Sequence, residues 1–429
     1  MSNDSHLLIP ARPLRWMYID FNSYFASVEQ QIDPRLRGRP TIVVPMMTDS
    51  TCAIAASVEA KRYGIRTGTK VYDAKRLYPG LAIVTADHRR YIDYHHRLIA
   101  VIEDYIPITR VGSIDEVACR LLNNENNPEY ATSLAQRIKA GIARRVGERL
   151  TCSIGVAPSP LLAKLASDAQ KPDGLVIYDG DALPDCIFSM AIDDICGVGR
   201  NMKRRLAQKG VFSIEDFCAL GPRRAGAIWG SRGGDRLWFE LHGIEMPPIE
   251  TQTRSLGHSH VLAPVNRMTD NALMVLRRLT LKAAARLRRK GYITSMVAIM
   301  VRREDDGQKW EDARACLPTQ DSFALLRIVD GLWNKMQTGM GRHYDGSRFK
   351  QVAVTFLDLE PVAASQYSLL SLVEEKKSHQ PALNHAIDAL NEKYRRPMVS
   401  LASNMAPAIK DMGTKIAFTR VPELAEFHE

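Results

Sequence analysis

Short apolar runs alternate with amphipathic stretches along most of the chain, which is typical of a mixed α/β protein. One apolar run ends at Asp20 and leads into a helical pattern that Asn22 or Ser23 can cap. Two shorter apolar segments flank the pair Asp115 and Glu116, with helical patterns before and after them. Together with the first run, these segments follow the order β-α-β-β-α-β, which predicts a ferredoxin-like sheet.

The elements expected before residue 171 are short, and Gly or Pro separates many of them. The expected strands are 14–21, 41–44, 81–84, 108–112, 117–122 and 151–156. The expected helices are 23–31, 53–63, 91–105, 130–146 and 161–170. A second β-α-β-β-α-β pattern begins at Arg254 and continues through 270–290, 293–302, 314–317, 322–336 and 349–357. The two patterns predict an α+β multidomain protein.

The acidic residues Asp20, Asp115 and Glu116 are expected at strand ends that share one rim of a sheet. Carboxylates that converge repel one another unless cations lie between them, and Mg²⁺ prefers oxygen ligands together with substrate phosphates. Two such ions about 4 Å apart stabilise the attacking and leaving oxygens of a phosphoryl transfer. The residues alone leave an equal alternative open, in which Asp20 caps the following helix and the acidic pair forms a solvated turn.

Two stretches carry a resemblance to a known family. Residues 20–29 read Asp-Phe-Asn-Ser-Tyr-Phe-Ala-Ser-Val-Glu, and residues 113–116 read Ser-Ile-Asp-Glu. They resemble the Y-family DNA polymerases, the lesion-bypass group that includes bacterial polymerase IV and the catalytic subunit of polymerase V. The resemblance implies a right-hand polymerase that copies primer–template DNA from dNTPs with low fidelity, in translesion synthesis. It also implies that Asp20, Asp115 and Glu116 are catalytic and bind two Mg²⁺ ions, for which Mn²⁺ can substitute.

The residues that follow Asp20 are implied to lie beside the metal ions and the nucleotide. The Phe21 backbone carbonyl would be a further metal ligand. Phe25 resembles the family's steric gate, an aromatic ring in the space that a ribonucleotide 2′-OH needs, and an ordinary core aromatic is the alternative. Ser23 and Tyr24 are implied as nucleotide-binding neighbours of the gate.

Two lysines are implied to contact the incoming triphosphate. Lys171 lies in Lys-Pro-Asp-Gly, which resembles the family's Lys-Pro-x-Gly signature, and its alternative is a solvated cation at a helix C-terminus. Ala55, Val58 and Lys61 stand where the commonest polymerase IV pattern has Thr, Tyr and Arg. The small residues resemble the polymerase V branch, and Lys61 offers a point charge without the two-pronged hydrogen bonding of Arg.

DNA contacts are implied in two later regions. Gly197 and Gly199 precede a basic helix expected at 201–209, and such a turn exposes N–H groups at a helix start, where one phosphate can bind. The turn resembles the helix-hairpin-helix of the family's thumb, so Gly197, Gly199 and Arg200 are the implied contacts, and a mere tight turn is the alternative. Arg254 is the implied contact of the next region, the little finger, in which most side chains of the basic helix are expected to be solvated.

The resemblance also implies partners for the C-terminal tail and a division of the chain into domains. Past the polymerase core, Gln366, Leu369 and Leu370 resemble the short peptide that holds bacterial polymerases to the sliding clamp. The remaining tail resembles the C-terminal segment of the polymerase V subunit, which implies an accessory subunit as a further partner. The implied domains are the palm (12–23 and 87–178), the fingers (24–86), the thumb (179–245), a linker (246–253), the little finger (254–358) and a C-terminal tail (359–429).

Composition supports this outline without specifying it. A length of 429 residues suggests three or four domains, and a net charge of +10 favours a polyanionic partner such as DNA. The seven Cys residues are scattered without a C-x-x-C pair, so we expect free thiols in a reducing compartment. The chain shows no signal peptide, and no apolar run approaches the roughly 20 residues that span a bilayer. We therefore expect a cytoplasmic, nucleoid-associated protein with no membrane partner.

Two other function classes stay open. A non-catalytic relative would be a DNA- and clamp-binding adaptor, and such a protein should have lost metal carboxylates, whereas all three remain here. A nucleotidyl cyclase uses a similar palm with paired carboxylates, but it needs neither the Gly197–Gly199 turn nor a clamp peptide. Primer extension separates the three functions.

Overall fold

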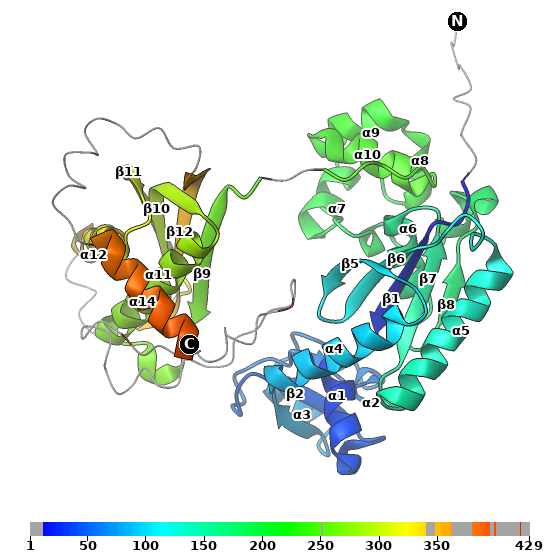
Figure 1. Cartoon of the computed structure of the whole chain (residues 1–429), viewed down its shortest axis with the longest axis horizontal. Coiled ribbons are helices and arrows are strands. Elements are labelled where there is room, and N and C mark those ends of the chain that lie inside the picture. The colour runs from blue at the N-terminus through cyan, green and yellow to red at the C-terminus, as the bar shows by residue number, and fades with distance from the viewer. Residues whose placement is uncertain are drawn as a thin grey trace, which may run out of the picture. The chain divides into compact units, whose positions relative to one another are not determined.

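The computed structural model describes residues 12–249, 252–339, 348–362, 380–394, 399 and 421 (Figure 1). The chain divides into two compact units, and the division falls between Pro248 and Ile249, inside the linker expected at 246–253. The first unit holds a five-stranded and a three-stranded sheet, and the second holds a four-stranded sheet. In these described ranges no helix is long and apolar enough to cross a membrane.

The five-stranded sheet has the expected ferredoxin-like core, with β1 between β6 and β7 and antiparallel to both. The outer strand β8, which the sequence pattern does not predict, is three residues long and pairs in parallel with β7. In order across the sheet, the strands are β5 (Ile108–Ser113), β6 (Glu116–Arg120), β1 (Trp16–Phe21), β7 (Cys152–Ala157) and β8 (Leu175–Ile177).

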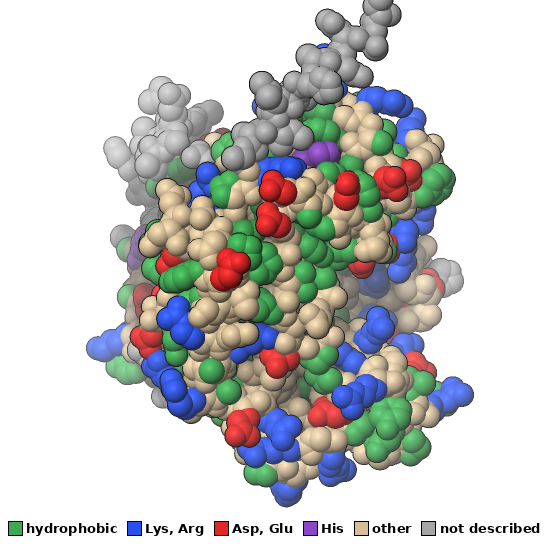
Figure 2. Space-filling view, turned by 90° about the vertical axis from the view of Figure 1, so that its right-hand side faces the viewer, with side chains coloured by type: hydrophobic (Ala, Val, Ile, Leu, Met, Phe, Trp, Pro, Cys, Tyr) green, Lys and Arg blue, Asp and Glu red, His purple; other side chains and the backbone are tan. Residues whose placement is uncertain are grey.

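The centre of this sheet is covered on both faces, because every residue of β1 and β7 is buried. Helix α6 (Pro160–Ala169) packs against both strands. It begins where the Ser159 hydroxyl accepts a hydrogen bond from the Leu162 N–H, with Pro160 at the first helical position. The longer helices α4 (His88–Glu103) and α5 (Pro128–Arg145) pack against each other. On the face that Figure 2 shows, basic and acidic side chains are interspersed.

The expected fingers contain the three-stranded sheet, and here one sequence prediction is wrong. The helix expected at 53–63 is a helix only over four residues, because Ala55 and Ala56 form a strand that pairs with β2. The Ser57 hydroxyl then caps the short helix by accepting from the Ala60 N–H. The strand β4 pairs in parallel with β2 and so belongs to this sheet. The elements are α1 (Tyr24–Ile32), β2 (Thr41–Val44), β3 (Ala55–Ala56), α2 (Val58–Lys61), α3 (Val71–Leu77) and β4 (Ala82–Thr85).

Four short helices, drawn in green at the top of Figure 1, form the expected thumb beside the palm sheet. They share one hydrophobic core with the palm, in which Trp16 of β1 joins Leu206, Phe217 and Trp238 of the thumb. Apolar packing therefore attaches the thumb to the palm. The helices are α7 (Arg200–Ala207), α8 (Ile214–Ala219), α9 (Pro222–Trp229) and α10 (Arg232–Leu241).

The second unit contains the expected little finger, with the predicted β-α-β-β-α-β order in an antiparallel sheet of order β11-β10-β12-β9. Two long helices bury the side of the sheet that carries Val297, Val354 and Phe356, and the buried Trp333 of α12 belongs to the same core. The elements are β9 (Ser255–Val261), α11 (Thr269–Arg289), β10 (Tyr292–Arg303), β11 (Lys309–Thr319), α12 (Ser322–Gly339) and β12 (Phe349–Pro361).

A helix of the C-terminal tail, α14 (Gln380–Tyr394), is attached to this second unit. The Arg288 guanidinium of α11 donates to both carboxylate oxygens of Asp388, at 2.6 and 2.9 Å. The Asn384 amide donates to Asp321 just before α12, at 2.6 Å. The tail therefore contributes a helix to the little-finger unit through partly buried polar contacts.

Candidate active site

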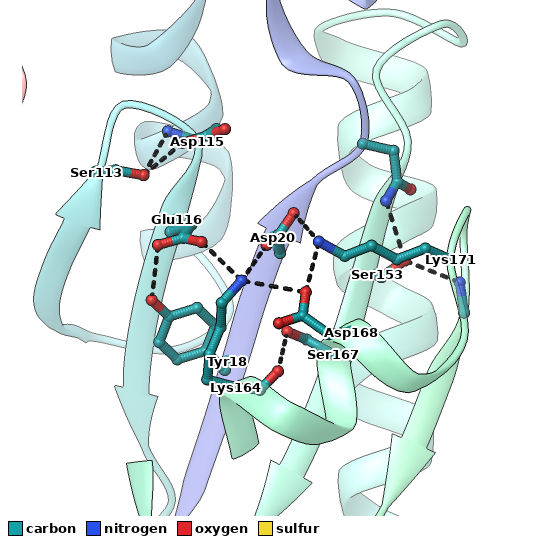
Figure 3. Close-up of polar contacts among 12 residues, drawn as sticks. Tyr18, Asp20, Ser113, Asp115, Glu116, Ser153, Lys164, Ser167, Asp168 and Lys171 are labelled. Carbon is teal, nitrogen blue, oxygen red and sulfur yellow. Dashed lines mark hydrogen bonds and ion pairs between the residues drawn. The ribbon is translucent and has the colours of Figure 1, made fainter. Parts of the chain in front are cut away.

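Two residues of the expected metal site lie opposite each other on neighbouring strands (Figure 3). The antiparallel register of β1 and β6 pairs Asp20 with Glu116. Asp115 directly precedes β6, and its carbonyl accepts a hydrogen bond from the Phe21 N–H at 2.9 Å. The sheet thus brings Asp20, Asp115 and Glu116 to one edge, and their role as metal ligands stays a prediction.

A lysine that the sequence pattern alone does not single out lies between the two paired carboxylates. The Lys164 Nζ is 2.5 Å from Asp20 Oδ2 and 2.7 Å from Glu116 Oε1. The Lys171 Nζ is 2.7 Å from Asp20 Oδ1. Both lysines also pair with Asp168 Oδ1, at 3.3 and 2.8 Å, so the five side chains form one ion-pair network (Figure 3). Its spacing of one helical turn from Asp168 indicates only a pair along the helix, so no local signal in the sequence shows the contact of Lys164 with Asp20 and Glu116.

Burial and opposite charge set the protonation of this network. Burial raises the pKa of Glu116, but the Lys164 ammonium and the Tyr18 hydroxyl, which donates to Glu116 Oε2 at 3.0 Å, outweigh burial and hold that pKa below its usual range. Burial lowers the pKa of Lys164, but the carboxylates of Asp20, Asp168 and Glu116 outweigh burial and hold that pKa above its usual range. Glu116 and Lys164 are therefore both charged at neutral pH.

Asp115 has different partners. Its Oδ1 accepts a hydrogen bond from the Ser113 hydroxyl, which lowers the pKa of Asp115. Burial has the larger effect and, with the charges of Asp20 and Glu116, raises that pKa above its usual range. Among the described residues, no group of three or more His, Cys, Asp or Glu side chains is arranged to hold a metal ion. The carboxylates of Asp20 and Glu116 are paired with lysines, and that of Asp115 accepts from Ser113.

The donor chemistry of this edge nevertheless fits a divalent cation. The Lys164 ammonium is itself a cation between Asp20 and Glu116, so the fold already places positive charge at this point. Carboxylate oxygens are also the ligands that Mg²⁺ prefers. A metal ion held by Asp20 and Glu116 would therefore take over the charge that Lys164 now supplies.

A cavity of about 310 Å³ adjoins the network through Lys171. Burial and the nearby charge of Lys171 lower the pKa of Lys61, which also lines the cavity. An anion in the cavity would relieve the repulsion between the two ammonium groups. The lining residues come from the end of β1, from α2 and its C-terminal end, and from the loop after α6; they are Asn22, Ser23, Val58, Lys61, Arg62, Lys171 and Pro172.

Asn22 ties the end of β1 to the loop that carries Lys171. Its Nδ2 donates to the Ser153 hydroxyl at 3.0 Å, and its Oδ1 accepts from the Asp173 N–H at 2.8 Å and from the Thr151 hydroxyl at 3.1 Å. Sequence reasoning considered Asn22 only as a helix cap. In the structure, Asn22 holds the loop that carries Lys171 beside the end of β1, where Asp20 lies.

Ser23, Tyr24 and Phe25 are neighbours in the chain but have different surroundings. Ser23 lines the cavity, whereas the Tyr24 hydroxyl is buried and donates to the Tyr91 carbonyl at 2.6 Å. The Phe25 ring is buried and stacks on the Tyr91 ring, with 4.2 Å between centroids and 13° between planes. His88 packs against the same two rings. Phe25 therefore has the contacts of a core aromatic, and its role as a gate stays a prediction.

Known proteins match this chain over nearly its whole length. The model of the impB/mucB/samB family matches residues 19–168, and the model of the C-terminal domain of that family matches residues 253–369. The DNA polymerase IV of Moorella thermoacetica is 31% identical over 91% of this chain and 96% of its own length. The chain belongs to the Y family of DNA polymerases.

Two further Y-family proteins extend the comparison. The DNA polymerase IV 2 of Mesorhizobium japonicum is 27% identical over 94% of this chain and 97% of its own length. A solved Y-family DNA polymerase chimera of Dbh and Dpo4 covers 81% of this chain and 99% of its own length, with a TM-score of 0.65 and 21% identity. This structural similarity shows that the fold of the Y-family polymerases is shared.

The DNA contacts expected in this Y-family member lie at exposed positions. Gly197 has a φ of 98°, which favours glycine, and Gly199 is the N-cap of α7, whose first residue Arg200 is exposed. Arg254 is exposed and directly precedes β9. The expected clamp residues Gln366, Leu369 and Leu370 lie outside the described residues. The DNA and clamp contacts all stay predictions.

Proposed function

We propose that this protein is a template-directed DNA polymerase that extends a primer 3′-OH with dNTPs. The observation that carries the proposal is the pairing of Asp20 with Glu116 at an edge that Lys171 joins to a cavity with basic lining. Carboxylates can hold metal ions, and a basic cavity can hold a triphosphate. Nucleotidyl transfer needs both features side by side.

The residues of the site would have different roles in the reaction. Asp20, Asp115 and Glu116, with the Phe21 carbonyl, would hold two Mg²⁺ or Mn²⁺ ions, which when bound supply charge stabilisation for the attacking and leaving oxygens. Lys171 and Lys61 bind phosphate oxygens as point charges and orient the triphosphate. Ser23 is an uncharged polar residue of the cavity lining that would bind the nucleotide beside these lysines, and Phe25 limits the space at the sugar.

We also propose translesion synthesis with low fidelity. The fingers consist of a three-stranded sheet and three helices, of which α2 has four residues and the longest, α1, has nine. Their contribution to the cavity lining includes Val58, an apolar residue that cannot hydrogen-bond a base or phosphate. A small lid with few directional contacts presses loosely on the nascent base pair and so tolerates a damaged template base.

The thumb turn at Gly197 and Gly199 and the little finger are proposed to bind the DNA. The side of the little-finger sheet that faces away from its hydrophobic core carries a row of small residues, where Ala313 pairs with Ala298, Ala298 with Thr355, and Thr355 with Gly257. The two ends of this row, Ala313 and Gly257, are exposed. Small side chains allow a duplex backbone to approach closely. Contacts of Arg254 and of the thumb turn with phosphates would position the duplex without reading its sequence.

The tail is proposed to bind a sliding clamp through Gln366, Leu369 and Leu370, and an accessory subunit is proposed as a further partner. Replacing all three residues with Ala should weaken pull-down by the clamp while distributive synthesis stays intact. Clamp binding that persists in this variant would show that the motif is a chance match.

Primer extension tests the proposed activity. Purified protein should add dNTPs to a primed template with Mg²⁺, and Asp115→Ala should abolish the addition because a metal-site carboxylate is lost. Asp181→Ala, an exposed acidic residue of the palm–thumb connection, is the matched control and should extend normally. Extension that survives Asp115→Ala would remove the catalytic assignment.

The same assay separates the other function classes. An adaptor would bind primed DNA without extending it. A cyclase would convert a nucleotide in the absence of primer and template. The three carboxylates that remain at the sheet edge favour the polymerase over the adaptor.

A further inference from the structure

The Lys164 ammonium is paired with three carboxylates at the proposed metal site. It donates hydrogen bonds to Asp20 Oδ2 at 2.5 Å and to Asp168 Oδ1 at 3.3 Å, and it forms an ion pair with Glu116 Oε1 at 2.7 Å. The side chain is only 14% exposed, and its Nζ lies 5.3 Å from the centre of the Tyr18 ring. The fold therefore holds this cation in one defined place.

In this position, Lys164 would compete with a metal ion for the carboxylate oxygens of Asp20 and Glu116. A divalent ion shared by Asp20 and Glu116 would draw on the carboxylate oxygens that Lys164 now occupies. An ammonium and a metal ion so close together repel each other strongly in a buried site. The contact of Lys164 with the two carboxylates must therefore be broken, at least in part, before such an ion can bind.

Asp168 is an alternative ion-pair partner for Lys164. It lies four residues after Lys164, one turn along α6, and is already within ion-pair distance of Lys164. Its Oδ1 is also 2.8 Å from Lys171, so the same carboxylate can hold both lysines when Asp20 is taken by an ion. A small rotation of the Lys164 side chain changes its partners without exposing an unpaired charge.

We propose that Lys164 is a resident counter-ion of the metal site. It holds Asp20 and Glu116 together in the free protein, a divalent ion competes with it, and Asp168 accepts it when it is displaced. Lys164 and Asp168 are thus positioning residues that set metal affinity. The inference rests on the proposed metal site, and its test is arranged so that the two can fail separately.

Mn²⁺ binding to the full chain, without DNA or nucleotide, is the first test, with free Mn²⁺ followed by electron paramagnetic resonance. Lys164→Met removes the competing charge and keeps the apolar stem, so we expect roughly tenfold tighter Mn²⁺ binding. Asp168→Asn removes the negative charge that accepts the displaced lysine, so we expect binding several-fold weaker than in the wild type. Lys75→Met, at an exposed ion pair with Asp49, is the control and should bind Mn²⁺ as the wild type does.

Thermal unfolding is the second test, because a purely structural lysine would not change the response to metal. In EDTA, Lys164→Met should melt at a lower temperature than the wild type, since Asp20 and Glu116 are left without their cation. Saturating Mn²⁺ should raise the melting temperature of Lys164→Met by more than that of the wild type. An equal rise in the two proteins would contradict the proposal.

The outcomes test the counter-ion role of Lys164 and the proposed metal site separately. If Lys164→Met binds Mn²⁺ no more tightly than the wild type, or if Asp168→Asn binds it as tightly as the wild type, Lys164 is not a competing counter-ion. If Lys164→Met does not fold, the Mn²⁺ affinity of Asp168→Asn still tests the counter-ion role. If the wild type binds Mn²⁺ no better than the double variant Asp20→Asn, Glu116→Gln, the metal site itself is wrong and the counter-ion role falls with it.

Discussion

The palm sheet and the little-finger sheet share one element order but differ in what they bury. In the palm, β1 and β7 are buried along their whole length, and the acidic edge is neutralised by lysines from α6 and the loop after it. In the little finger, every residue of β11 is exposed or half-buried, and the side of the sheet that faces away from the core carries small side chains. The same order of elements along the chain, arranged in two different strand orders, thus supports a buried charged site in one sheet and an accessible surface in the other.

This difference indicates how each region should respond to substitution. A buried charge that loses its partner costs several kcal/mol, so single changes at the palm edge should have large effects. Contacts along an accessible sheet with a phosphate backbone are many and individually weak, and salt screens them. We therefore expect steep effects in the palm and small, salt-dependent effects in the little finger.

Outside the acidic edge, the largest effect is expected at Phe25 of α1, whose ring stacks on Tyr91 of the palm. Phe25→Ala removes the ring that the proposed gate places against a ribonucleotide 2′-OH, so the ratio of kcat/KM for ribonucleotides to that for dNTPs should rise on the order of 100-fold. Phe25→Leu keeps more of the packing against Tyr91 and should give a smaller rise. Phe212→Ala, which removes a ring that is 68% exposed in the thumb, is the control. Unchanged sugar selection in both Phe25 variants would show that Phe25 is only a core residue.

An intermediate effect is expected from the buried His88 beside Phe25. Burial lowers the pKa of His88 from 6.5 to about 4, so between these values the unfolded chain binds more protons than the folded one. The contribution of His88 to stability is therefore full above pH 6.5 and is lost as the pH falls toward 4. From pH 7 to pH 5 the wild type should lose about 2 kcal/mol more unfolding free energy than His88→Phe. Urea titrations of both proteins at the two pH values measure this difference, and equal losses would contradict it.

The smallest effect is expected at Arg254 in the little finger. Arg254→Ala removes one phosphate contact, so affinity for primed DNA should fall only a few-fold and the slope of log affinity against log salt should decrease by about 1. Fluorescence anisotropy at several salt concentrations gives both quantities. Arg35→Ala, at an exposed pair with Asp33 in the fingers, should leave the slope unchanged. A loss of affinity that is the same at every salt concentration would show that Arg254 does not contact phosphate.

The sequence predicts most of the fold because the apolar periodicity is clear in the long elements. The strand at 41–44 is found as expected, and the long helices differ from expectation by a few residues at each end. The helix expected at 53–63 is mostly wrong because Ala55 and Ala56 are compatible with either structure, and pairing with β2 decides for a strand. The three-residue β8 is too short to leave a periodic signal.

The candidate site is predictable only in part for a related reason. The resemblance names Asp20, Asp115 and Glu116, but only the register of β1 and β6 shows which two face each other. Lys164 was missed because a lysine in a helical pattern is usually solvated, and nothing local shows that α6 turns this one toward β1. A contact between distant elements has no periodic signature in the chain.

The most direct test of the account is single-turnover incorporation of one dNTP by Glu116→Gln in Mg²⁺. Gln keeps the size of the side chain and an oxygen for the Tyr18 hydroxyl, but it removes the negative charge opposite Asp20. If Asp20 and Glu116 act together on metal ions and triphosphate, the rate should fall roughly 100-fold or more while primed DNA still binds. A rate equal to that of the wild type would contradict the proposed function.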